Sequence, residues 1–194
     1  MTGGSYSETV RGRMEELGVS DREALFRFRS YASEEEFRKM MWDVRKRSRN
    51  IESISWAVII AVCIVLSFKT GSFYFSGFAA VGVYRIYSNM VKAKRFIDAN
   101  FEERRKRRGS GEVDEYLYFF DEGYISDHGE RGCYIHRYGK EDFIYLKNGY
   151  MFIGSYANKG ANMTGDYIIY RDCPDKEEFI DFIREKNPNA RVMK

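Results

Sequence analysis

The sequence has few of the residues that mark a secreted scaffold or an enzyme of a known class. Its 194 residues include 3 cysteines, 2 histidines and 2 prolines. An odd number of well-separated cysteines excludes a disulfide framework and favours a reducing compartment for the polar part of the chain. The net charge of +3 excludes a strongly basic nucleic-acid binder. There is no glycine-rich phosphate loop.

The residues that commonly carry catalysis are scattered. His136 follows Cys133 by three positions in a predicted strand, so the two side chains point to opposite faces. That geometry is poor for a shared metal ion or for a nucleophile–base pair. Ser126 and Ser155 lie outside any nucleophile elbow. We therefore expect no catalytic residue, metal or cofactor, and no small-molecule substrate is evident.

Two uncharged runs, Ser53 to Phe68 and Thr70 to Tyr84, are the strongest feature of the sequence. Extended back to Ile51, the first run covers roughly 27 Å as a helix, close to the thickness of the hydrocarbon core of a bilayer. The second run is weaker because it contains several glycines and serines and is followed by Arg85.

Three arrangements of these runs compete. One long helix would extend about 48 Å and leave basic clusters on both sides of the membrane, against the positive-inside rule. A buried helix pair in a soluble protein would need more apolar chain around it. A hairpin turning at Lys69-Thr70-Gly71 places the basic clusters on one side. We therefore expect a multi-pass membrane protein with both termini in the cytoplasm.

Cations beyond the second run are candidates for contact with lipid head groups. Arg85 lies close enough to the expected membrane surface to snorkel, although an intramembrane charge is also a candidate for a buried functional role. The distal cations, Arg104 to Arg108, begin about 25 Å past the span. For them, contact with lipid and a solvated helix end are both open interpretations, and nucleic-acid binding is a weaker third. We expect the lipid bilayer to be a partner and nucleic acid not to be one. The candidates are Arg85, Lys92, Lys94, Arg95, Arg104, Arg105, Lys106, Arg107 and Arg108.

The remaining sequence predicts an α+β fold. Ser33 and Glu36 fit a capping box that opens an amphipathic helix, whose apolar stripe is Phe37, Met40, Met41 and Val44. Asn148-Gly149 fits a two-residue type I′ turn between two strands, and an acidic first turn opens a C-terminal helix. The expected division is a flexible N-terminus (1–23), a strand and amphipathic helix (24–50), the transmembrane hairpin (51–90), a basic helix and linker (91–111), a cytoplasmic antiparallel β-rich domain closed by a C-terminal helix (112–187) and a tail (188–194).

This arrangement resembles the YcxB-like family of small bacterial membrane proteins over most of the chain, from about Ala24 to Asn187. The resemblance rests on Phe26 to Phe37, on Phe119-Phe120-Asp121-Glu122-Gly123-Tyr124, on Tyr167-Ile168-Ile169-Tyr170-Arg171 and on Glu177-Glu178-Phe179. It implies a bacterial inner membrane and a cytoplasmic domain similar to pleckstrin-homology-like (PH-like) barrels. It implies no activity and no catalytic residues.

These observations favour a membrane-anchored cytoplasmic interaction module that binds a protein or lipid partner, and they leave homo-oligomerisation open. Tyr145, Tyr150 and Tyr156 are candidates for a contact surface, although core packing explains them equally well. The alternatives are a membrane-associated enzyme with an unrecognised site, lined by groups such as His136, Asp166 or Arg171, and an accessory subunit of a transporter.

Overall fold

The protein is described by a computed structural model that covers residues 6–147, 149–157 and 162–193. The chain forms two compact units. The first unit combines Met1–Ser33 with Glu112–Lys194 and holds all the strands, and we call it the β-rich unit. The second unit, Glu34–Gly111, is a pair of long helices, and we call it the helical unit.

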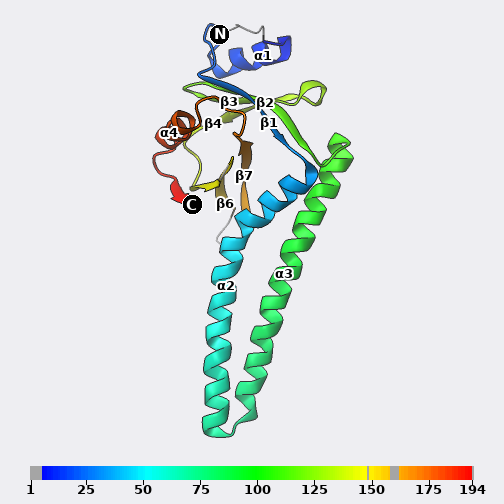
Figure 1. Ribbon diagram of the computed structural model, residues 1–194, viewed down its shortest axis with the longest axis vertical. Coiled ribbons are helices and arrows are strands. Elements are labelled where there is room, and N and C mark those ends of the chain that lie inside the picture. The colour runs from blue at the N-terminus through cyan, green and yellow to red at the C-terminus, as the bar shows by residue number, and fades with distance from the viewer. Residues whose placement is uncertain (1–5, 148, 158–161, 194) are drawn as a thin grey trace. The chain divides into compact units, whose positions relative to one another are not determined.

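The helical unit is an antiparallel hairpin of α2 (Glu34–Thr70) and α3 (Phe73–Arg108), as Figure 1 shows. The reversal at Gly71 and Ser72 begins one residue after the centre of the predicted turn. Gly71 has a φ angle of 66°, a left-handed conformation that glycine adopts without strain. The predicted amphipathic helix, spans and basic helix are therefore continuous parts of two helices.

The first turns of α2 follow the sequence prediction. Three glutamates, Glu34 to Glu36, occupy the helix N-terminus, where negative charge is favourable. The predicted stripe is buried and packs toward α3, where Phe37 meets Phe101 edge to face with ring centres 5.6 Å apart. The buried residues of the stripe are Phe37, Met40, Met41 and Val44.

Among the described residues, one helical segment is long and apolar enough to cross a membrane, and it is Glu52–Thr70 of α2. The second predicted run does not meet the same criterion. Tyr74, Tyr84 and Arg85, together with several glycines and serines, lower its mean hydropathy. Length and composition therefore support one span and not two.

The β-rich unit contains two four-stranded sheets, which confirms the α+β class. In the first sheet, all strand pairs are antiparallel and the order is β1-β2-β3-β4. In the second sheet, the order is β7-β6-β5-β8, with β8 parallel to β5. The strands are β1 (Phe26–Ala32), β2 (Val113–Phe119), β3 (Gly123–Asp127), β4 (Cys133–Arg137), β5 (Phe143–Lys147), β6 (Tyr150–Ala157), β7 (Asn162–Ile169) and β8 (Arg191–Met193). A short 3₁₀ helix, η1 (Gly129–Arg131), joins β3 to β4.

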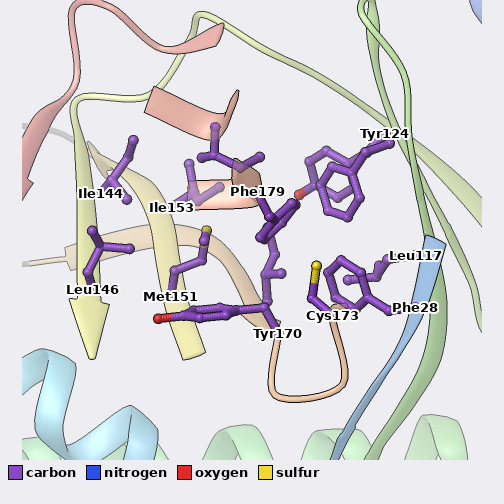
Figure 2. Packing of buried hydrophobic residues seen from close by; sticks show 13 residues of the cluster. Phe28, Leu117, Tyr124, Ile144, Leu146, Met151, Ile153, Tyr170, Cys173 and Phe179 are labelled. Carbon is purple, nitrogen blue, oxygen red and sulfur yellow. The ribbon is translucent and has the colours of Figure 1, made fainter. Parts of the chain in front are cut away.

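The main core of this unit lies between the two sheets and helix α4 (Lys176–Lys186). Figure 2 shows the α4 residue Phe179 between side chains of the two sheets, with Ile144 and Ile153 on one side and Phe28 on the other. Phe179 is fully buried and contacts four aromatic rings. This helix therefore closes the core, as predicted for the C-terminal helix.

The N-terminal segment differs from the flexible region expected over residues 1–23. Helix α1 (Glu8–Leu17) begins at Ser7, whose hydroxyl accepts a hydrogen bond from the Val10 amide, and ends at the left-handed Gly18. Its buried residues Val10, Met14 and Leu17 pack with side chains on the outer face of the first sheet. The helix is ordered because its i, i+4, i+7 apolar face has a sheet to cover.

Two strands also lie outside the expected domain limits. β1, expected with the amphipathic helix, pairs with β2 along its whole length, from Phe26 opposite Phe119 to Ala32 opposite Val113. The expected tail contains β8. Gly149 has the positive φ angle required by the predicted β5–β6 turn, but Asn148 lies outside the described residues.

Candidate functional site

Between residues 52 and 90, a part of the helical unit that we call the apolar level, the outer faces of the two helices are apolar and many of the side chains between the helices are small or polar. The side chains that lie between the two helices recur at spacings of three and four residues, and six of the ten are small or polar. We call this set the hairpin seam. It comprises Ser53, Trp56, Ile60, Cys63 and Ser67 of α2, with Phe75, Ala79, Gly82, Ile86 and Asn89 of α3.

Close approach and hydrogen bonding hold the hairpin seam. A Cβ atom added at Gly82 would lie 2.7 Å from Cγ1 of Ile60, so the helices meet where only glycine fits. Near the turn, the Ser67 and Ser76 hydroxyls are 2.9 Å apart, and the Ser67 hydroxyl also donates to the Ser72 carbonyl. Small residues and interhelical hydroxyl contacts are typical of helices that pack within lipid.

The outward faces of the same segments carry large apolar side chains. In α2 the exposed set is Ile54, Val58, Ile59, Val62, Ile64, Val65, Leu66 and Phe68. In α3 it is Phe73, Tyr74, Phe78, Val81, Val83, Tyr84, Tyr87 and Met90. Soluble helix pairs place polar and charged residues on their outer faces, so the outer face of this pair is the reverse of theirs.

The nine predicted head-group residues fall into two groups. Arg85, Lys92, Lys94 and Arg95 are all exposed on α3, and none has an ion pair or hydrogen bond with a described residue. We call these four the exposed cation set. Arg85 and Lys92 are seven residues apart and therefore share one face of the helix. Lys46 of α2, at the level of Arg95, is exposed in the same way.

The distal cations are largely engaged within the helical unit. The Arg104 guanidinium lies 4.6 Å from the ring centre of Phe37. The Arg105 guanidinium donates to both carboxylate oxygens of Glu34, at 2.7 and 3.1 Å. Arg107 pairs with Glu103 at 2.5 Å, Lys106 is exposed, and the Arg108 side chain lies outside the described residues. Packing of the hairpin therefore accounts for Arg104 and Arg105 without a lipid.

A polar network occupies the inner face of the first sheet, beside the apolar core. Oδ2 of Asp166 on β7 lies 2.9 Å from Nδ1 of His136 on β4 and accepts a hydrogen bond of 2.8 Å from the Tyr124 hydroxyl on β3. Nε2 of His136 lies 3.0 Å from the Ser126 hydroxyl. The His136 ring also stacks on the Tyr124 ring, with centres 4.4 Å apart and planes 4° from parallel. We call these four residues the His136 network.

The charge state of this network follows from its contacts. Burial raises the pKa of Asp166, but the hydrogen bond and charge of His136 and the Tyr124 hydrogen bond outweigh it, so the pKa lies below its usual 3.8. Burial and the neighbouring Asp166 carboxylate raise the pKa of Tyr124 well above its usual value. Asp166 is therefore an anion at neutral pH, and Tyr124 is a neutral donor. A neutral His136 would donate from Nδ1 to Asp166 and accept the Ser126 proton at Nε2.

These distances are those of a serine–histidine–aspartate triad, but the order of exposure is opposite to that of a hydrolase. Asp166 is 49% exposed and His136 is 26% exposed, whereas Ser126 is 4% exposed. Hydrolysis also needs backbone N–H donors for the developing oxyanion. Ser126 lies in β3, which pairs with β2 on one side and β4 on the other, so the strand's amides are used in the sheets. The geometry therefore fits a polar tie between the two sheets.

A second histidine–carboxylate pair lies on the same sheet face. Nε2 of His128, which directly follows β3 and caps η1, is 3.1 Å from a carboxylate oxygen of Glu115 on β2, and both side chains are almost buried. Buried polar groups of this kind need partners, and each histidine of the chain has a carboxylate. Neither pair extends into a metal site, since no group of three metal-ligating side chains is placed to hold an ion within the described residues.

The structure sorts the other predicted candidates. It brings His136 and Asp166 together, whereas Arg171 donates to the Tyr31 carbonyl. Cys133 is buried beneath α1, on the opposite sheet face from His136, as predicted. Tyr150 is buried, so packing accounts for it, and the Tyr156 side chain lies outside the described residues. Sequence reasoning missed the pairing of Asp166 with Tyr124 because 42 residues separate them.

Comparison with known proteins identifies no relative: no protein-family model, no curated protein and no solved structure matches the chain.

Proposed function

We propose that α2 and α3 insert together into a bilayer and hold the β-rich unit at its cytoplasmic face as an interaction module. The observation that carries this proposal is the inverted polarity of the helical unit. At the level of residues 52–90 both helices direct large apolar side chains outward, while six of the ten hairpin-seam residues are small or polar. Lipid tails solvate such an exterior, whereas water does not.

The second helix enters the membrane as part of this pair, despite its weaker hydropathy. Ala79, Gly82 and Asn89 lie at the hairpin seam, where α2 and not lipid is the neighbour, and the Ser76 hydroxyl meets that of Ser67 across the pair. Tyr84 and Tyr87 lie near the end of the apolar level, the depth at which tyrosine is enriched in membrane proteins. Hydropathy averaged over the whole helix therefore understates its lipid-facing side.

The exposed cation set supports both an orientation and a partner. Lys69 lies at the hairpin turn, while Lys46 and the exposed cation set lie at the opposite end of the apolar level. The positive-inside rule places that end in the cytoplasm. Cations without protein partners at this level attract anionic lipid phosphates, at about 1 kcal/mol for each residue near the surface.

The β-rich unit is the part of the chain available to bind a partner outside the membrane. Two four-stranded sheets closed by a C-terminal helix are compatible with the PH-like arrangement and the YcxB-like membership expected from the sequence. An interaction role is favoured over an enzymatic one because Ser126, the residue that would act as the nucleophile, is buried, whereas Asp166 is the most exposed of the triad-like residues in the His136 network.

The test is substituted-cysteine labelling in intact bacterial cells. A Lys69→Cys variant should react with a membrane-impermeant maleimide added outside the cells, and a Lys106→Cys variant should react only after the membrane is opened. The unmodified chain is the background control, because Cys133 and Cys173 are buried. A chain that leaves the membrane fraction in alkaline carbonate would refute the anchor, and the opposite labelling pattern would refute the orientation.

The lipid preference needs a separate measurement. Binding of the detergent-solubilised chain to anionic vesicles should weaken in a Lys92→Glu/Arg95→Glu variant, by about one factor of ten or more for the two charge reversals. Lys106→Glu is the matched control, since Lys106 is an equally exposed cation farther from the apolar level. Equal losses in the two variants would show that the exposed cation set has no special contact with lipid.

A further inference from the structure

A groove of about 370 Å³ lies between α2 and α3, beyond the cytoplasmic end of the apolar level. Its surface is mostly apolar, and Ile97 and the half-buried Trp42 form part of its lining. Trp42 is ten residues before Glu52, about 15 Å along the helix axis, so the groove stands clear of the hydrocarbon core in the proposed orientation. Pockets that bind small ligands have volumes of about 300–1,000 Å³.

The charged residues around this groove differ in whether they have an ion-pair partner within the described residues. Arg38 pairs with Asp98 and with Glu34, so its charge is compensated within the helical unit. Lys39 and Lys94 are exposed and have no hydrogen bond or ion pair with a described residue. They approach the groove from different helices, with Lys39 on α2 and Lys94 on α3. Glu35 is the one uncompensated acid among the lining residues.

We propose that this groove binds an anionic amphiphile with a single apolar chain, such as a fatty-acid carboxylate. The apolar chain lies against Trp42, above the buried Ile97, and the carboxylate is placed between Lys39 and Lys94. The ligand class follows from two properties of one site, since an apolar surface selects the chain and two uncompensated ammonium groups select the head. Lys94 belongs to the exposed cation set and also lines the groove, whereas Arg85, Lys92 and Arg95 are not among its lining residues and remain available to the bilayer.

The size of the groove favours a small molecule over a protein segment. A docked amphipathic helix needs a row of apolar pockets for side chains at i, i+3, i+4 and i+7. The groove spans only residues 35–42 of α2 and 94–98 of α3, and its volume is near the lower limit for ligand pockets. Trp42, which lies about 15 Å along the helix from Glu52, also places the apolar part of the groove beyond the hydrocarbon tails of bilayer lipids.

Trp42 gives a direct assay, because the chain contains 2 tryptophans and the other is Trp56 in the hairpin seam. The full chain carrying Trp56→Phe, in nanodiscs of zwitterionic lipid, reports quenching of Trp42 by ω-bromodecanoate. We expect saturable quenching. A chain carrying Trp42→Phe retains Trp56 and measures how much of the probe has entered the bilayer.

Charge variants then test the head-group contact. Lys39→Glu/Lys94→Glu should weaken the apparent affinity at least about tenfold, since two attractive contacts become repulsive. Glu35→Gln should strengthen it slightly, and Lys106→Glu, outside the groove, should leave it unchanged. All four positions are exposed, so the far-ultraviolet circular dichroism of each variant should match that of the parent. The proposal is overturned if quenching of Trp42 does not saturate, if neutral ω-bromodecanol binds as well as ω-bromodecanoate, or if the double charge reversal has no effect.

Discussion

Replacing Asp166 with asparagine removes the charge of the His136 network and keeps its shape. One oxygen, Oδ2, serves both His136 and the Tyr124 hydroxyl. The amide oxygen of asparagine can take the same place but is uncharged, so both hydrogen bonds lose the strength that the carboxylate gives them. Tyr124 is 5% exposed, so its hydroxyl cannot turn to water for a better acceptor. A hydrogen bond to a charged group contributes about 1.5–3 kcal/mol, against about 0.5–1.5 kcal/mol for a neutral one.

The half-exposed position of Asp166 moves this cost toward the lower end. Water screens the contact with His136, so we expect Asp166→Asn to lower the free energy of unfolding of the β-rich unit by about 1–2 kcal/mol. The corresponding fall in Tm is about 4–10 °C for a unit of this size. Thermal unfolding of the full chain in detergent, followed by near-ultraviolet circular dichroism, measures it through the stacked Tyr124 ring.

A double-mutant cycle identifies the source of the loss. In a Tyr124→Phe background the hydrogen bond from this hydroxyl is already absent, so Asp166→Asn should cost at least about 0.5 kcal/mol less than in the parent. Additive losses in the two variants would show that the Tyr124 hydrogen bond does not contribute, and would refute the energetic argument for the network.

The same variant has a defined pH dependence. The pKa of Asp166 is lower in the folded chain than its ordinary 3.8, so folding favours the ionised carboxylate. This contribution is complete above pH 3.8 and disappears as the pH falls through the lowered value of the folded chain. The stability difference between the parent and Asp166→Asn should therefore shrink as the pH falls below 3.8. A difference that stays the same at pH 3 contradicts the assigned charge.

Three further predictions test the packing of each unit. Gly82→Leu should separate the helices, because even a Cβ atom there would lie 2.7 Å from Ile60. Disulfide cross-linking between cysteines introduced at Ser67 and Ser76 should then be weaker than in the same double-cysteine chain with Gly82. Phe179→Ala should destabilise the β-rich unit by about 3–5 kcal/mol in thermal unfolding, since it empties a fully buried ring site. Burial raises the pKa of Cys133 to about 11, so iodoacetamide should modify it at pH 7.5 only after unfolding, and rapid modification of the folded chain would show that α1 does not cover it.

The sequence predicted elements whose signals are local. The amphipathic stripe from Phe37 to Val44 and the acidic start of α4 depend on neighbours within a few residues, and both are present as expected. Strands β2 to β6 follow short runs of β-branched and aromatic residues between turns. The periodicity of α1 was present in Val10, Met14 and Leu17, but its mainly polar composition obscured a short helix that depends on the sheet beneath it.

Contacts between distant strands were not predictable in the same way. β8 has three residues and pairs in parallel with β5, so no local period marks it. The His136 network requires that β4 and β7 face each other across two sheets. A pair of glycines, Gly154 opposite Gly165, lets β6 and β7 approach closely just before Asp166, since a Cβ atom at Gly165 would lie 2.0 Å from the Ile153 carbonyl oxygen. A single sequence shows the glycines but not the partner that their contact positions.

Exposure of the outer face of the hairpin to water would cost the protein a large part of its stability. Complete burial of a valine, leucine or isoleucine side chain is worth about 1.5–3 kcal/mol, so each partly exposed apolar residue on the outer face of the hairpin forfeits about 1 kcal/mol in water. The described part of α2 alone has eight such residues from Ile54 to Phe68. That loss of about 8 kcal/mol is comparable to the whole stability of a typical domain, about 5–15 kcal/mol. A cover of lipid or protein is therefore needed. Lipid meets this need on every side of the hairpin at once, whereas a protein partner would have to surround both helices.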